Sequence, residues 1–348
     1  MRPRKTPLTS PPLVRLATVC LAVGAMLALA ACGSSKSAAN ELTLYNGQHE
    51  QTTALLVRDF ERKTGIKVQI RSADEATLAN QIIQEGSNSP ADVFYTENSP
   101  ALEALGEKGL LAPVDGSTLA AVPHSDSSQR GDWVGVSGRV SEIVYNIAAM
   151  KGRRLPGSLI ELAEPNFKGM VGFAPSETDF QPLVTAISKL KGRQAAKAWL
   201  EGMKENGRVY PDNETVVAQV NNGESAVGPI NHYYWYRLRR EQGESGIHSR
   251  LLSFPRGDPG NLINVSGAAV LRSSGKQADA QKLLAYLVSE AGQRTLAGSD
   301  SYEYPLRPGV SPPAGLAPLS SFGPSSLTPA QLGDGHEALE LEQQVGLL

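Results

Sequence analysis

The order of apolar and amphipathic segments predicts an α/β protein with two lobes, each a mixed, mostly parallel sheet flanked by helices. Short apolar runs alternate with helical stretches along the chain, which is typical of βαβ units. This alternation starts near residue 41 and starts again near residue 140. About 300 residues follow the N-terminal leader, and that length is sufficient for two hydrophobic cores.

The elements of the first half are read from apolar runs bounded by turn residues and from the amphipathic stretches between them. Gly65 comes directly after Lys63 and Thr64, a pattern that is typical of a helix end. The expected order is strand 42–45, helix 52–64, strand 68–70, helix 75–85, strand 92–95 and a short helix over 100–109.

The second half repeats the alternation. Its expected order is strand 142–145, strand 170–173, helix 180–190, helix 194–206, strand 225–230, strand 265–270 and helix 279–290. The stretch 308–329 is rich in Pro, Ser and Gly, so we expect surface loop there. A final helix is predicted over 329–345.

The N-terminus has the features of a lipoprotein signal. Four basic residues precede an apolar run over 16–31, which is short for a membrane span and ends in Leu-Ala-Ala-Cys. We therefore expect a signal peptide over 1–31 that is removed, with Cys32 becoming the lipidated first residue. A plain signal peptide with an incidental cysteine is the alternative. The Ser- and Ala-rich segment 32–40 is expected to be a tether.

The composition excludes several classes of function. The formal net charge of −2 becomes −6 when the leader, with four basic and no acidic residues, is removed. The chain has no basic stripe of the kind that neutralises phosphates, so we expect no nucleic-acid partner. Its two cysteines are Cys20 and Cys32, which leaves the folded part without a disulfide or a thiolate metal site. It also lacks a nucleophile elbow, a phosphate loop and a His-Glu-x-x-His helix, and we predict that it is not an enzyme.

Four side chains with hard donor atoms follow strand-like runs. They are His49, Glu97, Tyr233 and Tyr234. Ligands of open α/β sheets bind at the carboxyl ends of strands, so these residues are expected to converge on one crevice. Adjacent side chains on a strand point to opposite faces, so both phenols can reach one ion only at a loop or a helix start.

These donors suit a small and highly charged cation. A phenol loses its proton near neutral pH only when a strong Lewis acid binds its oxygen, which makes ferric iron the natural candidate. With both phenols ionised, the set carries three negative charges and balances a trivalent ion. Each residue also has a structural alternative: a hydrogen-bonded histidine, a carboxylate at a helix start, and tyrosines that form core or an aromatic surface.

Two motifs carry a resemblance to a known family. They are Leu-Tyr-Asn-Gly-Gln-His over 44–49 and Ala-Asp-Val-Phe-Tyr-Thr-Glu over 91–97. With the tyrosine pair, the chain resembles the ferric-iron-binding solute receptors of bacterial ABC importers, from about residue 42 to about residue 308. That resemblance implies the type II periplasmic-binding-protein fold. It also implies that His49, Glu97, Tyr233 and Tyr234 hold Fe³⁺ between two lobes that close by a hinge.

The resemblance has further implications for organisation and partners. The strand at 265–270 is expected to return to the first lobe. The lobes would then comprise 41–139 with 265–307, and 140–264 with 308–348. The expected partners are the permease and ATPase of an iron importer, and the receptor is expected to be a monomer. It would be exported and lipid-anchored to the outer face of the cell membrane, or periplasmic.

In the family, a small anion such as phosphate or carbonate often completes the iron's shell. The positions that match this anion site are Ser176, Glu177, Thr178, Asp179, Asn213 and Asn231. Here Glu177 and Asp179 replace small residues and should repel phosphate. We therefore expect one of these two carboxylates to complete the shell or to orient a water, with Arg139 balancing charge.

A receptor of the same fold for an organic solute is the alternative function. Thiamine, a polyamine or a phosphonate could be bound in a box made by Tyr233, Trp235 and Asp92. The complete motifs around His49 and Glu97 favour iron over this alternative. His232 is a further residue of interest beside the tyrosine pair.

Overall fold

The computed structural model describes residues 41–348. The leader expected over 1–31, the tether over 32–40 and the lipidation site at Cys32 lie outside the described residues. Within 41–348, every helix is too short or too polar to cross a membrane.

The first part of the chain forms a parallel sheet in the order β2-β1-β3, covered by helices. Its elements are β1 (Glu41–Gly47), α1 (Glu50–Thr64), β2 (Lys67–Ser72), α2 (Glu75–Glu85), β3 (Val93–Thr96), α3 (Pro100–Glu107) and the single turn α4 (Gly116–Leu119). Gly65 ends α1 with a φ of 74°, as the sequence predicted. The expected elements of this part are therefore confirmed within a few residues.

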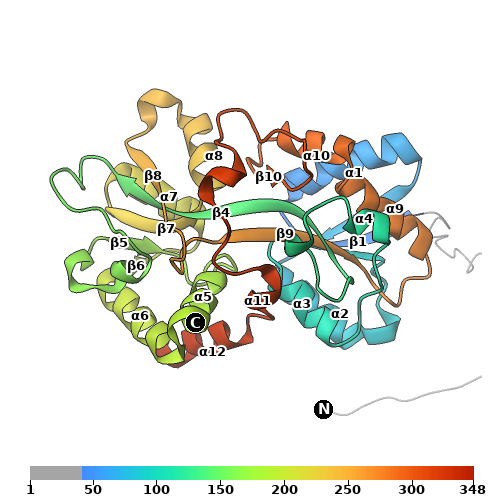
Figure 1. The fold of residues 1–348 in the computed structure, drawn as a ribbon, viewed down its shortest axis with the longest axis horizontal. Coiled ribbons are helices and arrows are strands. Elements are labelled where there is room, and N and C mark those ends of the chain that lie inside the picture. The colour runs from blue at the N-terminus through green and yellow to red at the C-terminus, as the bar shows by residue number, and fades with distance from the viewer. Residues whose placement is uncertain (1–40) are drawn as a thin grey trace, which may run out of the picture. The chain divides into compact units, whose positions relative to one another are not determined.

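Two long antiparallel strands, β4 (Val134–Asn146) and β9 (Ile263–Val270), run side by side through the middle of Figure 1. β9 pairs with β3, and the first half of β4 pairs with β9 and with β10 (Tyr304–Pro305). The second half of β4 pairs with β7 (Val227–Asn231) and β8 (Ser249–Ser253). A single continuous sheet therefore connects both parts of the protein through β4.

The rest of the sheet follows the order β4-β7-β5-β6, with β7, β5 and β6 parallel to one another. The elements here are β5 (Val171–Phe173), α5 (Gln181–Lys191), α6 (Arg193–Asn206), β6 (Gly207–Val209), α7 (Asn213–Asn222) and α8 (His232–Gln242). β9 is followed by α9 (Gln277–Leu287) and α10 (Glu290–Ala297). The sheet is mixed, with antiparallel pairs at its centre and parallel pairs toward its two ends.

The C-terminal helix predicted over 329–345 is wrong in one respect, because it is split in two. α11 (Pro329–Leu332) and α12 (His336–Val345) are separated by Gly333 and Gly335, which have φ values of 68° and 76°. These left-handed conformations suit glycine and interrupt a helix. α12 packs against α5 and α6, beside the marked C-terminus in Figure 1.

The buried apolar residues form two large clusters. The first core contains buried side chains from 42–136 and from 265–306, including the fully buried Phe60 and Trp133. The second core contains buried side chains from 143–262 and from 327–341, including Trp199. A smaller cluster contains Val216, Val220 and the side chains at the start of α8.

Glu342 on α12 is a carboxyl group buried beside the second core, and its burial leads to a testable dependence of stability on pH. Its side chain is fully buried, and neither carboxylate oxygen has a hydrogen-bond partner among the described residues. Burial raises the pKa of Glu342 from 4.5 to about 8. The folded state therefore keeps a proton that the unfolded chain releases above pH 4.5, so stability falls as the pH rises from 4.5 toward 8.

We expect Glu342→Gln to raise the free energy of unfolding by about 1–3 kcal/mol at pH 8 and to change it little near pH 4.5. Urea unfolding at the two pH values measures the difference. Glu340→Gln is the matched control on the same helix; its side chain is 45% exposed, so the substitution should have little effect at either pH. An equal gain for Glu342→Gln at both pH values would contradict the assignment of a buried titrating carboxyl.

Candidate metal centre

The four side chains proposed as ligands lie at the ends of three strands. His49 follows β1 and occupies the N-cap position of α1, while Glu97 directly follows β3. β1 and β3 are parallel and in register, with Gly47 opposite Thr96, so both side chains leave the sheet at the same edge. Tyr233 and Tyr234 lie in the first turn of α8, directly after β7.

The structure brings these four side chains together. The Tyr233 hydroxyl donates to Glu97 Oε1 over 2.7 Å, and His49 Nε2 lies 3.4 Å from the same oxygen. The Tyr234 hydroxyl donates to Asp179 Oδ2 over 3.1 Å, and Asp179 Oδ2 is 3.4 Å from the Tyr233 hydroxyl. Three candidate ligands therefore meet at Glu97, and Asp179 connects them to the fourth.

The helix start explains how two adjacent tyrosines share one site. Successive residues of an α-helix are about 100° apart, whereas those of a strand point to opposite faces. The two rings lie 4.1 Å apart with an interplanar angle of 33°, and both side chains are buried. The expectation that the backbone turns at Tyr233 is confirmed.

Arg139 and Asp179 complete a buried ion-pair network with Glu97. Arg139 Nη1 lies 2.6 Å from Glu97 Oε1 and 3.4 Å from Asp179 Oδ1, and the Arg139 side chain is fully buried. Arg139 Nη2 donates to Asn98 Oδ1 over 2.9 Å and to the Glu97 carbonyl oxygen. One guanidinium therefore neutralises two carboxylates that come from different parts of the chain.

Asn98 and Glu75 support the Glu97 loop, and neither residue was predicted from the sequence to belong to the site. Glu75 Oε2 accepts hydrogen bonds from the backbone N–H groups of Glu97 and Asn98, at 2.9 and 2.8 Å. The Asn98 amide donates to Glu75 Oε1 over 3.1 Å and to Asp179 Oδ1 over 3.3 Å. Gly47 permits this contact, because a Cβ there would lie within 2.5 Å of Glu75 Cβ. The position of Asn98 directly after the proposed ligand Glu97 was the only feature of the sequence that could have indicated this role.

Only some of the residues matched to an anion site lie beside the candidate ligands. Asp179 contacts the tyrosine pair, and Thr178 Oγ1 accepts from the Asn98 amide over 3.1 Å. Ser176 is exposed and donates to a backbone oxygen. Asn231 Oδ1 accepts from Ser141 and Asn264, and the amide nitrogen of Asn231 is buried without a partner among the described residues. The remaining two are the half-buried Glu177 and the buried Asn213 at the start of α7.

The charges of the site respond to burial and to one another. Although burial opposes it, His49 and Arg139 hold the pKa of Glu97 well below its usual range. Burial and the nearby Glu97 raise the pKa of Asp179 to about 6. Burial and these two carboxylates raise the phenol pKa values of Tyr233 and Tyr234 well above 10. Both phenols are therefore neutral in the empty site and need a strong Lewis acid to lose their protons.

Glu177 differs from Asp179 in its protonation. Burial and the charge of Asp179 raise the pKa of Glu177 to about 8, so this carboxyl is protonated at neutral pH. Repulsion of an anion at this loop therefore comes from Asp179, whose carboxylate already accepts from the tyrosine pair.

The box proposed for an organic cation is not assembled. The Asp92 carboxylate pairs with Lys276 and accepts from the Thr43 N–H at the opposite end of β3 from Glu97. Trp235 donates to Ser249 Oγ over 3.1 Å. This interpretation of Asp92, Trp235 and Tyr233 as one binding box is therefore wrong.

His232 has a structural role. His232 Nδ1 accepts from the Val140 N–H over 3.1 Å, and Nε2 lies 2.8 Å from the Tyr302 carbonyl oxygen. Tyr302 has a φ of 55°, the one positive value at a non-glycine residue in the described chain. With both ring nitrogens occupied, His232 fixes the start of α8 to the loop that carries Tyr302.

A large cleft opens beside the candidate ligands. Its volume is about 1200 Å³, and His49 and Tyr234 are part of its lining. The cleft also receives side chains from α1, α7, α8 and the loop over 298–302. The proposed site is therefore accessible from solvent along one side.

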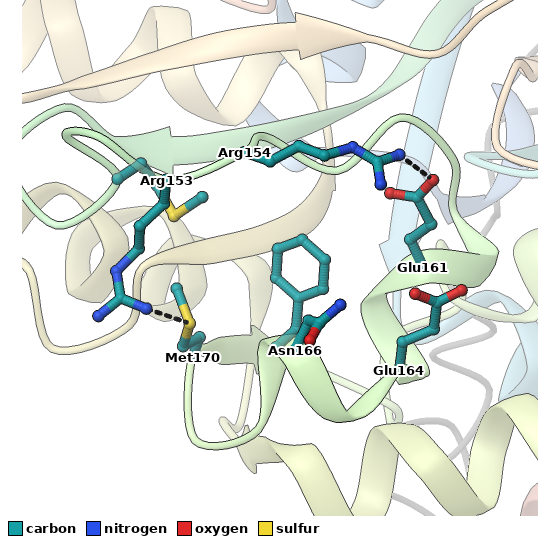
Figure 2. A pocket seen from close by; sticks show the side chains of 8 residues that line it. Arg153, Arg154, Glu161, Glu164, Asn166 and Met170 are labelled. Carbon is teal, nitrogen blue, oxygen red and sulfur yellow. Dashed lines mark hydrogen bonds and ion pairs between the residues drawn. The ribbon is translucent and has the colours of Figure 1, made fainter.

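A second cavity of about 270 Å³ lies elsewhere and contains none of the candidate ligands. Figure 2 shows Arg154 paired with Glu161 at 2.7 Å and Arg153 directed to the Met170 sulfur. This mixture of paired charges and apolar side chains offers no metal ligand set. Between residues 41 and 348, no cluster of three or more His, Cys, Asp or Glu side chains has metal-binding geometry.

Comparison with known proteins extends over nearly the whole chain. A family model for bacterial extracellular solute-binding proteins matches residues 88–318. The chain is 39% identical over 328 residues to the Fe(3+)-binding periplasmic protein of Serratia marcescens, covering 94% of this chain and 96% of that protein. It is 39% identical over 326 residues to the major ferric iron-binding protein of Neisseria meningitidis, with coverage of 92% and 97%. Iron-bound HitA from Pseudomonas aeruginosa matches with a TM-score of 0.84 and 44% identity, covering 88% of this chain and 99% of HitA.

Proposed function

The chain belongs to the bacterial extracellular solute-binding protein family, and on that premise we propose that it is an ABC-importer receptor that captures ferric iron. Its fold is the type II periplasmic-binding-protein fold expected from the sequence. Its relatives are transport receptors and not enzymes. The relatives named above are described as ferric-iron-binding proteins, which supports iron as the cargo.

One observation carries this proposal. His49, Glu97, Tyr233 and Tyr234 converge from three strand ends, with Glu97 Oε1 within 3.4 Å of both His49 Nε2 and the Tyr233 hydroxyl. In the loaded protein, two phenolates, a carboxylate and a neutral imidazole would bind Fe³⁺, and the metal would displace the phenol protons. Asp179 would complete the shell as a further oxygen donor or orient a water there.

The proposed ligands also suggest how capture is coupled to closure. His49 and Glu97 belong to the part of the chain that builds the first core. The tyrosine pair follows β7, a strand that contributes to the second core. We propose lobes comprising 41–139 with 265–307 and 140–264 with 308–348, which close about the ion by a hinge. Assembling ligands from both lobes adds affinity, and acid favours release because protons compete for phenolate and carboxylate.

The proposal places the protein outside the cytoplasmic membrane. Periplasmic relatives support export, and the predicted leader over 1–31 agrees with it. We propose that Cys32 carries a lipid anchor and that the monomeric receptor delivers its cargo to a membrane permease driven by an ATPase. Labelling the protein with a radioactive fatty acid in cells would test the anchor, with Cys32→Ala as the unlabelled control.

An absorption titration tests iron capture. The mature chain, without residues 1–31, is titrated with ferric citrate in the presence and absence of phosphate. We expect a visible tyrosinate-to-iron charge-transfer band that saturates at about one equivalent, since the ligand set forms a single site. The band should be indifferent to phosphate, because the Asp179 carboxylate lies against both tyrosine hydroxyls and would repel a second anion there. Zinc is the control, since it binds oxygen and nitrogen donors without giving a visible band; absence of the band with iron in both buffers would contradict ferric capture.

A further inference from the structure

Glu303 is a fully buried carboxylate near the proposed ligands, in the loop between α10 and β10. Its Oε2 accepts hydrogen bonds from the Ser137 hydroxyl on β4 and from Gln48 Nε2, the latter over 3.3 Å. Its Oε1 is buried without a hydrogen-bond partner among the described residues. Burial of an incompletely bonded carboxylate lowers stability, so packing alone does not explain this residue.

Gln48 connects Glu303 to the proposed ligand His49. The side-chain nitrogen of Gln48 donates to Glu303 Oε2 and, over 2.9 Å, to Ser266 Oγ. The side-chain oxygen of Gln48 accepts from the backbone N–H of His49 over 2.7 Å. Both ends of this buried amide are therefore bonded inside the protein. Glu303 and Ser266 thus set the orientation of the amide that holds the His49 backbone.

The same network reaches the proposed ligand Glu97. Ser266 lies on β9, and its hydroxyl donates to the Thr96 carbonyl oxygen over 2.6 Å. Thr96 directly precedes Glu97, so the peptide that leads into this ligand is held from β9. The ends of β1 and β3 are therefore joined to Glu303 through Gln48 and Ser266.

The residue before Glu303 connects the network to the helix of the tyrosine pair. The Tyr302 carbonyl oxygen lies 2.8 Å from His232 Nε2, and the Tyr302 ring stacks on Tyr236 with 5.6 Å between the ring centroids. The φ of 55° at Tyr302 is unfavourable for a residue with a bulky side chain. Such a conformation persists only where the surrounding contacts determine the backbone. The loop is therefore fixed to α8 through Tyr302 and to β1 and β4 through Glu303.

The charge of Glu303 also acts on its surroundings. Although burial opposes it, Glu97 and, more weakly, Glu303 raise the pKa of His49. Burial and the charge of Glu303 raise the pKa of Tyr95 above its usual value. Glu303 is therefore close enough to influence the centre, but its charge affects His49 less than the charge of Glu97 does.

We propose that Glu303 is a positioning residue of the metal centre. It fixes the strand ends that carry His49 and Glu97 and connects them, through Tyr302, to the helix that carries the tyrosine pair. The inference rests on the proposed function and adds to it the residue that holds ligands from three strand ends in place. Residues that orient ligands without touching the metal contribute to affinity, because the ligands then need less reorganisation when the ion binds.

Three substitutions of Glu303 in the mature chain separate positioning from charge and from packing. Glu303→Leu removes both acceptor oxygens. Glu303→Gln keeps an acceptor oxygen in place without the charge, and Glu303→Asp keeps the charge but withdraws it from Gln48 and Ser137. The readouts are the ferric affinity from competition with desferrioxamine, the absorption maximum of the visible band, and urea unfolding of the iron-free protein.

We expect Glu303→Leu and Glu303→Asp to lower ferric affinity by about 10–100-fold and to shift the absorption maximum of the band. Glu303→Gln should lower the affinity by about threefold or less, because its amide oxygen still accepts from Ser137 and Gln48. If Glu303→Leu does not fold, the comparison of Glu303→Asp with Glu303→Gln still separates position from charge.

Glu103→Leu is the matched control. Glu103 is also a buried carboxylate, and its hydrogen bonds go to Arg130 and Trp133 instead of to the network around Gln48. The control should lower the free energy of unfolding and leave the ferric affinity and the band of the folded protein unchanged.

The outcomes separate this proposal from the proposed function. If Glu303→Leu and Glu303→Asp reduce stability but bind iron as the unaltered protein does, Glu303 has only a structural role and the proposal is overturned. It is also overturned if Glu303→Gln loses as much affinity as Glu303→Leu, since charge would then explain the effect. In both cases the band of the unaltered protein leaves ferric capture intact. Absence of any iron band in the unaltered protein would instead refute ferric capture, and the positioning role with it.

Discussion

Replacing Tyr233 and Tyr234 together by phenylalanine will abolish the visible iron band and lower ferric affinity by more than about 100-fold. The change removes both anionic phenolates and leaves His49 and Glu97 as a two-donor set. The empty protein should remain folded, because each substitution removes only a hydroxyl that donates to the Glu97 or Asp179 carboxylate, a loss of about 2 kcal/mol apiece. Circular dichroism and urea unfolding check the fold, and the titration with ferric citrate checks binding.

Tyr236→Phe is the matched control for this double variant. Tyr236 lies on the same helix and stacks on Tyr302 at 5.6 Å, outside the set of proposed ligands. The control should keep the band at full intensity. Retention of the band by the double variant would mean that the colour and the iron come from other residues, and the ligand assignment would have to be abandoned.

Replacing Arg139 by leucine is expected to destabilise the iron-free protein by about 3–5 kcal/mol. The substitution leaves Glu97 and Asp179 buried near each other without a counter-charge, which is the most expensive way to break a buried ion pair. Ferric iron would supply positive charge at the same place. The stability difference between the variant and the unaltered protein should therefore narrow when both are loaded.

Urea unfolding with and without iron measures this effect. Arg130→Leu is the control, because Arg130 also bridges two carboxylates, Glu103 and Asp132, in the first core's part of the chain. Its side chain is 38% exposed, so the expected loss is smaller and independent of iron. If Arg139→Leu fails to fold, Arg139→Lys retains the charge and should show a smaller loss with the same dependence on iron. A loss for Arg139→Leu that iron leaves unchanged would contradict the electrostatic role.

The sequence predicted the site's scaffold well because the relevant signals are local. The apolar runs over 42–45 and 92–95 predict strands whose ends meet at one edge, and the structure confirms both as β1 and β3, which end at Gly47 and Thr96. Helix α8 was harder to predict, since its first turn is built of His, Tyr and Trp, which have modest helix propensity. Its tertiary packing, including the bonds of His232 to Val140 and Tyr302, supplies what propensity lacks.

Other features of the site depend on long-range placement. Arg139 was expected to balance charge, but its contact with both Glu97 and Asp179 requires β4, β3 and the loop after β5 to be assembled. The contacts of Asn98 could not be predicted from the sequence either, because its partners are distant along the chain. Strand β4 was predicted over 142–145 only, since Gly135 and Gly138 weaken the strand signal. In the structure a side chain at Gly135 would clash with the Asp126 carbonyl oxygen, which explains the glycine.

The ion pairs of Arg139 with Glu97 and Asp179, here called the Arg139 bridge, affect how efficiently the proposed receptor would deliver its cargo. In the hinged receptor proposed above, the guanidinium that joins Glu97 to Asp179 would let the closed form exist without cargo, at a population set by the strength of this bridge. Empty closed receptors would compete with loaded ones for the permease if the permease recognises closure alone. Delivery would then require iron to stabilise the closed form more than the Arg139 bridge does. The difference between these two stabilisation free energies would set the ratio of loaded to empty closed receptors that reach the permease.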